Sequence, residues 1–145
     1  MINILKGAIL IFTFMELSNI LIMYFKPNFK YGNSMNTFKQ WYKAQNNESE
    51  RLFVKYMVNW VANCKLIFLT LLIVVVLFGN EMITVFAVIA TILSIGIYFV
   101  SLHPIIKRLD AMDEIQPKGY SKTLALTIGA FMIMFSLALI LYFLL

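Results

Sequence analysis

The sequence predicts an all-α, polytopic integral membrane protein, a four-helix transmembrane bundle with a short interfacial helix in its first cytoplasmic loop. Two observations carry this prediction. The 145 residues are 61% hydrophobic and 13% charged, whereas soluble globular proteins are about 45–50% apolar and about 25% charged. The apolar residues also gather in four long segments, and in lipid only helices or closed barrels satisfy the backbone polar groups. We therefore expect a single transmembrane domain over residues 1–145.

The four spans are expected at residues 4–25, 57–78, 82–102 and 123–144. Each has the length of about 20 residues that a helix needs to cross a hydrocarbon core of about 30 Å. Pro27 should end the first span, and residues 31–34 have the composition of a turn. The first span is too long for the apolar part of a signal peptide and lacks a small-residue cleavage site, so we expect it to be retained.

Charge predicts the topology. Ten of the twelve Lys and Arg residues lie in the connecting segments 26–56 and 103–122, and positive charge in short loops marks the cytoplasmic side. We expect both loops to be cytoplasmic and both termini outside, in a bacterial inner membrane. The net charge of +5 is thus explained by the lipid bilayer, without a nucleic-acid partner. The single Cys64 allows no disulfide within the chain.

Glu16 lies near the middle of the first span, where a carboxylate is most costly. Counted from the exterior, it is about 18 Å deep, and Lys65 on the second span is about 20 Å deep, at 1.5 Å per residue. We therefore predict a Glu16–Lys65 pair, with Asn19, Asn59 and Asn63 as hydrogen-bond partners. Such a site either locks the bundle or holds a proton or cation. The alternative is that Lys65 extends to the cytoplasmic headgroups.

Residues 34–44 place Met35, Phe38 and Trp41 on one side and Lys39 with Lys43 on another. This pattern is typical of a helix in the membrane interface, whose lysines face anionic headgroups. A lid or ligand-binding role is the alternative interpretation.

Two helix starts are expected beyond this segment. Asn47 should be the N-cap of the second spanning helix, with Glu50 at the capping-box position, and the helix should continue unbroken to Phe78. Its first turns should project into the cytoplasm. Ser121 should cap the fourth span.

Residues 103–114 combine His103 with three acids, Asp110, Asp113 and Glu114. Pro104 should kink or end the third helix. The segment contains no recognised metal motif, and we expect a solvated loop in which Lys107 and Arg108 neutralise the acids. The sequence therefore predicts no metal site, and it shows no catalytic constellation and identifies no cofactor.

Residues 42–50, YKAQNNESE, resemble the glutathione-binding segment of the MAPEG family of membrane enzymes, with Lys43 where that family carries Arg. The resemblance implies four spans, a long first cytoplasmic loop and exterior termini. It also implies an enzyme acting on a lipophilic substrate at the cytoplasmic face. The candidate residues of such a site are Lys43, Asn47, Glu50, Arg51 and His103. Separately, residues 7–10 followed by Glu16 in the first of four helices are similar to small multidrug exporters.

Three classes of function follow from these patterns. The first is a small proton- or cation-coupled transporter or channel, oligomeric because four helices enclose little space, with Glu16, Asn19, Asn59, Asn63 and Lys65 as its site. The second is the MAPEG-like enzyme. The third is a non-catalytic accessory or assembly subunit of a membrane complex, in which the polar groups only hold helices together. The solute and the oligomeric state are not set by the sequence.

Overall fold

The computed structural model describes residues 4–26, 28–29 and 35–145. The predicted all-α, four-helix architecture is confirmed for these residues. The long helices are α1 (Ile4–Phe25), α3 (Glu48–Phe78), α4 (Glu81–Ser101) and α6 (Tyr120–Leu144). The shorter ones are η1 (Met35–Thr37), α2 (Lys39–Ala44) and α5 (His103–Ala111). The expected break at Pro27 and the turn at 31–34 lie outside the described residues.

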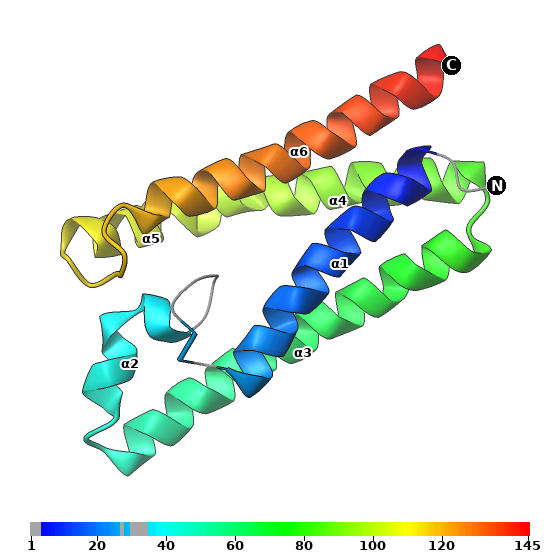
Figure 1. Cartoon of the computed structure of the whole chain (residues 1–145). Coiled ribbons are helices and arrows are strands. Elements are labelled where there is room, and N and C mark those ends of the chain that lie inside the picture. Colours follow the sequence, from blue (N-terminus) through cyan, green and yellow to red (C-terminus); the bar gives the residue numbers. More distant parts are fainter. Residues whose placement is uncertain (1–3, 27, 30–34) are drawn as a thin grey trace.

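Four helices are long and apolar enough to cross a membrane, with α4 and α5 counted together as one. The chain is therefore a multi-pass membrane protein. The start of α1, the C-terminus and the α3–α4 turn lie at one end of the molecule, and α2 and α5 lie at the other (Figure 1).

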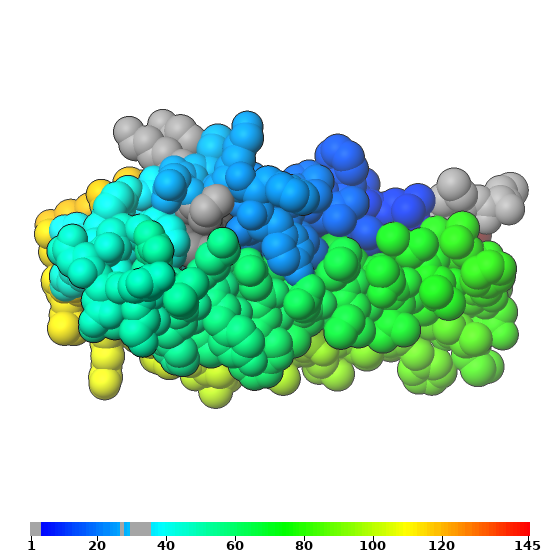
Figure 2. Space-filling model, turned by 90° about the horizontal axis from the view of Figure 1, so that it is seen from below, coloured from blue at the N-terminus to red at the C-terminus, as the bar shows by residue number. Residues whose placement is uncertain are grey.

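Helix α1 is the centre of the bundle, because it packs against α3, α4 and α6 (Figure 1). The long α3 covers one face of the molecule from end to end (Figure 2). Phe12 of α1 joins the layers: its ring meets Phe131 edge-on at 5.0 Å between centroids, and it also contacts Phe68 and Phe135. Aromatic pairs favour this geometry because the positive edge of one ring meets the negative face of another.

Asn47 is the N-cap of α3, as predicted. Its side-chain oxygen accepts hydrogen bonds from the backbone N–H of Ser49 at 3.0 Å and of Glu50 at 3.5 Å. The reciprocal half of the capping box is absent among the described contacts, because the backbone N–H of Asn47 donates to the carbonyl of Ala44 instead. With 31 residues, α3 is about 46 Å long and must extend beyond the hydrocarbon core.

Pro104 does end the membrane helix, since α4 stops at Ser101 and Pro104 lies in the first turn of α5. A proline is tolerated there because its missing N–H would have no helical partner. The expectation of a solvated loop over 103–114 is therefore wrong for its first part, which is helical to Ala111.

Ser121 is not the N-cap of α6, contrary to our prediction. The helix begins at Tyr120, and Gly119 precedes it with a φ of 84°, a left-handed conformation that glycine adopts without steric cost. The cap comes from another helix. Asp110 of α5 accepts the N–H of Gly119 at 2.9 Å, the N–H of Ser121 at 3.1 Å and the Ser121 hydroxyl at 2.5 Å. Asp110 thus ties α5 to the start of α6.

We expect Asp110→Ala to lower the free energy of unfolding by about 1 kcal/mol, the usual cost of removing a helix cap. Thermal unfolding in detergent micelles measures this loss. The matched control is Lys107→Ala, three residues earlier on α5, whose exposed side chain has no hydrogen bond or ion pair among the described contacts. Equal melting temperatures for Asp110→Ala and Lys107→Ala would contradict the capping role.

Candidate functional site

The predicted ion pair between α1 and α3 is confirmed. The Lys65 Nζ atom lies 2.5 Å from Glu16 Oε2 and donates a second hydrogen bond, of 2.8 Å, to Asn19 Oδ1. Lys65 therefore does not extend to the headgroups in this arrangement. One ammonium group instead binds the carboxylate and the amide oxygen that α1 presents on successive turns.

Both charged residues sit within the contact between the two helices. On α3, Lys65 lies in the stripe of Ala62, Leu69 and Leu72, which are 0%, 2% and 4% exposed. Residues three and four apart share one face of a helix, so this stripe is the side of α3 that meets α1. Glu16 has the same position on α1, between buried Thr13 and buried Ile20. The pair thus replaces one apolar layer of the interface.

A second polar contact lies nearer the α2 end, where the Tyr24 hydroxyl donates to Asn63 Oδ1. Glu16 and Tyr24 are eight residues apart, about 12 Å along α1. We call the set Glu16, Asn19, Tyr24, Asn63 and Lys65 the polar seam. Tyr24 was not predicted, because a tyrosine at a helix end has the sequence signature of an interface anchor.

The predicted hydrogen bonds of the asparagines are confirmed only for Asn19. Asn63 bonds Tyr24 and not the ion pair. Asn59 is half-buried and has no polar partner in the described part of the chain. The structure therefore gathers four of the five predicted intramembrane residues, Asn59 excepted, into the polar seam.

The polar seam is exposed along one edge and closed at the end nearer the chain termini. The side chains of Lys65 and Glu16 remain 28% and 19% exposed, and Asn63 is exposed. Towards the termini, Ile9 and Phe12 of α1 meet Leu69 and Leu72 of α3, and none of the four is more than 5% exposed. We call these four residues the apolar plug.

Thr13 lies between the polar seam and the apolar plug. It is 6% exposed, and its hydroxyl has no hydrogen-bond partner among the residues that the structure describes. Other threonines within the helices differ: the hydroxyls of Thr84, Thr91 and Thr127, for example, donate to the carbonyl four residues earlier. A buried hydroxyl without a partner is costly, so Thr13 marks this position as unusual.

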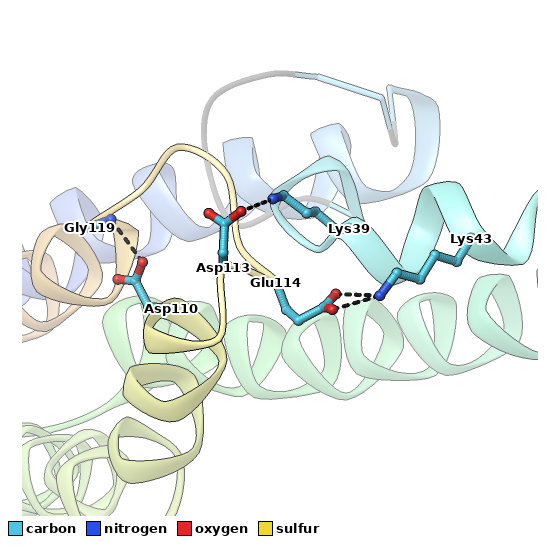
Figure 3. Close-up of polar contacts among 6 residues, drawn as sticks. All are labelled: Lys39, Lys43, Asp110, Asp113, Glu114 and Gly119. Carbon is cyan, nitrogen blue, oxygen red and sulfur yellow. Dashed lines mark hydrogen bonds and ion pairs between the residues drawn. The ribbon is translucent and has the colours of Figure 1, made fainter.

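The two connecting segments bind each other at the opposite end of the molecule (Figure 3). Lys39 lies 2.6 Å from Asp113, and Lys43 lies 2.6 and 2.8 Å from the two carboxylate oxygens of Glu114. The expectation that these lysines face headgroups is therefore wrong, as is the expected neutralisation of these two acids by Lys107 and Arg108. The reason is a bridge between Phe38 and Ile115, which brings the two segments into register.

This contact extends to the backbone. The N–H of Lys39 donates to the carbonyl of Glu114 at 2.9 Å, and the N–H of Gln116 donates to the carbonyl of Thr37 at 2.8 Å. Trp41 is 8% exposed, and its indole N–H donates to the Asn28 side chain at 2.8 Å. The predicted interfacial helix is thus the shorter α2, and it is held by protein contacts.

The five candidate residues for a cytoplasmic-face site do not converge on one point. Lys43 pairs with Glu114, Asn47 caps α3 with Glu50 beside it, and His103 Nδ1 lies 3.3 Å from the Tyr98 hydroxyl. The side chain of Arg51 is exposed and makes no polar contact among the described residues. No group of three or more His, Cys, Asp and Glu side chains within the described ranges could hold a metal ion.

Comparison of the chain with known protein families, curated proteins and solved structures finds no match.

We expect Glu16→Ala and Lys65→Ala each to destabilise the protein by about 3 kcal/mol, because each leaves one charge without its partner inside the helix contact. The exchanged variant Glu16→Lys/Lys65→Glu should recover most of the lost stability. Expression level and thermal unfolding in detergent measure both effects. Lys43→Ala, which removes a surface pair, is the control and should change little. An exchanged variant no more stable than the singles would argue against the pair.

The contact between the loops should weaken in acid. Lys39 donates a hydrogen bond to Asp113 and lowers the pKa of that carboxyl below its ordinary value of 3.8. A lowered folded-state pKa adds stability above 3.8 that is lost as the pH falls through the folded-state value. Wild type should therefore unfold at a higher temperature than Asp113→Asn at pH 7, and the difference should shrink as the pH falls below 3.8. A difference that is constant over this range would contradict the pairing.

Proposed function

We propose that the chain is a small proton- or cation-coupled transporter, with the Glu16–Lys65 pair as its binding site. The observation that carries the proposal is the asymmetry around this pair. Polar contacts made by Asn19 and by Tyr24 with Asn63 lie on the α2 side of the pair, beside the buried Ile20 and Ala62, and the apolar plug lies on the other side. A site whose polar contacts extend towards one end of the bundle is the arrangement expected of one state of a transporter that exposes its site to each side in turn.

The energetics favour a function over a purely structural role. An apolar pair of similar volume would hold α1 against α3 at least as well, because a buried ion pair seldom repays its desolvation. Ionisable groups at membrane depth usually belong to ion or proton pathways. A proton on Glu16 would remove the charge that holds Lys65, so the occupancy of Glu16 and the position of Lys65 would change together.

Oligomerisation is part of the proposal. The polar seam is partly exposed on the single chain, and charged groups in a bilayer face a bundle interior or water. A second copy, or another membrane subunit, would cover this edge. The same exposed edge favours the second candidate function, an accessory subunit that binds a partner helix here without transporting anything.

We place both termini outside and α2 and α5 in the cytoplasm of a bacterial inner membrane. The support is that the α2 and α5 end carries most of the basic residues, which is typical of the cytoplasmic side.

The test uses proteoliposomes with a pH-sensitive dye inside, to which Na⁺, K⁺ or tetraphenylphosphonium is added. We expect at least one of these cations to drive a proton flux that Glu16→Gln abolishes while the variant remains folded. Glu81→Gln, which removes an exposed carboxylate at the start of α4, is the matched control and should keep the flux. A flux no larger than that of protein-free liposomes for all three cations would overturn transport by these cations and favour the accessory role.

A further inference from the structure

We propose that the chain forms a homodimer in the membrane through the outer face of α3, where the Asn63 amides of the two copies bind each other. This inference rests on the oligomerisation that is part of the proposed function, and it names the partner and the surface. Helix α3 covers one face of the molecule from end to end (Figure 2), so its outer side can meet another helix along its whole length.

The outer face of α3 has the spacing of a coiled coil. From Phe53 to Leu77 a series of residues recurs in alternating steps of three and four, and every member of the series is exposed. This spacing keeps one face of each helix against its partner in a left-handed pair, the usual geometry of helices in membranes. We call this series the α3 outer face. The buried stripe of Ala62, Leu69 and Leu72 lies on the other side of the helix, against α1.

Asn63 is the member of the α3 outer face that lipid cannot satisfy. It lies fifteen residues from Phe78, about 22 Å along the helix and thus inside a hydrocarbon core of about 30 Å. Its carbonyl oxygen accepts the Tyr24 hydroxyl, but its exposed NH₂ group has no acceptor among the described residues. The other polar member, Thr70, donates to the carbonyl of Ile67. An amide donor without an acceptor in hydrocarbon is costly, so a group outside the chain should bind Asn63.

A second copy supplies that group. All copies enter the membrane in the same orientation, so two copies related by a twofold axis along the membrane normal bring the same residue of α3 to the same depth. Asparagine is both a donor and an acceptor, and its carbonyl oxygen keeps a second lone pair beside the one used by Tyr24. The two Asn63 side chains can therefore donate to each other. One asparagine in such a face also fixes the register of two parallel helices.

The part of the α3 outer face near α2 favours a protein partner over lipid. Phe53 is 63% exposed and lies 25 residues from Phe78, which is about 37 Å and beyond the reach of a hydrocarbon core of about 30 Å. A second α3 would cover it. Between residues 52 and 78 no charged residue lies on the face or at the heptad positions that flank it, so two copies meet without repulsion between like charges.

The interface is tested by cysteine crosslinking in the membranes of expressing cells, in a Cys64→Ser background that removes the single native cysteine. Ile67→Cys places a thiol on the α3 outer face. Ile133→Cys on α6 is the matched control, because Ile67 and Ile133 are 63% and 62% exposed and each lies eleven residues from the end of its helix. We expect copper phenanthroline to convert most of Ile67→Cys into a disulfide-linked dimer and to leave Ile133→Cys monomeric.

The Asn63 contact is tested by the dissociation constant of the dimer in lipid vesicles, measured by energy transfer between copies labelled at the C-terminus. We expect Asn63→Leu to raise this constant about tenfold, the usual size of the effect of hydrogen bonds between helices in membranes. Tyr24→Phe removes the bond within the chain and keeps the amide, so it should leave the constant unchanged. Equal constants for Asn63→Leu and wild type would overturn the contact.

The proposal is overturned if Ile67→Cys crosslinks no more than Ile133→Cys, which would assign the face to lipid. It is also overturned if the product does not have twice the mass of the chain, which would assign the face to another subunit. If Asn63→Leu does not fold, the crosslinking decides. A dimer without proton flux in liposomes would support the interface and remove the transport function, whereas flux without a dimer would overturn the interface and leave transport.

Discussion

The ion pair between Glu16 and Lys65 constrains the contact between α1 and α3, because a charge at membrane depth is costly without a partner. The pair fixes the register of α1 against α3. Helix α1 in turn contacts α4 and α6, and its Phe12 holds the aromatic layer shared with α6. The position of one carboxylate thus determines how the central helix meets its neighbours.

The two ends of the molecule are held together by different kinds of contact. Nearer the termini, Ile9, Phe12, Leu69 and Leu72 form an apolar layer between α1 and α3, and the Tyr142 hydroxyl of α6 donates a hydrogen bond to Glu81 at the start of α4. At the α2 and α5 end, polar groups are matched across the connections: Asp110 caps α6, and two lysines pair with two acids. The polar seam lies between this charged end and the apolar plug.

The features that depend on one residue and its sequence neighbours could be predicted from the sequence. Hydropathy predicted the four membrane spans, and Asn47 predicted the start of α3. Counting residues along each span predicted that Glu16 and Lys65 lie at the same depth in the membrane. The predictions that were wrong concern contacts between segments that are distant in the sequence. Asp110 caps a helix that begins ten residues later, and Lys43 pairs with Glu114, which is 71 residues away. Nothing in the local pattern of Lys43 distinguishes a carboxylate partner from an anionic headgroup. Thr13 was placed beside Glu16, but its lack of a hydrogen bond shows only in three dimensions.

The account depends most on Glu16 being an ionised partner of Lys65 in the bilayer. Carboxyl infrared difference spectroscopy of the protein in lipid, with Glu16→Gln as reference, measures this directly. We expect the Glu16→Gln difference spectrum at neutral pH to show the loss of a carboxylate band, and the same band to shift in Lys65→Gln. A protonated carboxyl band lost in Glu16→Gln and unaffected by Lys65→Gln would contradict the ion pair and the function proposed for it.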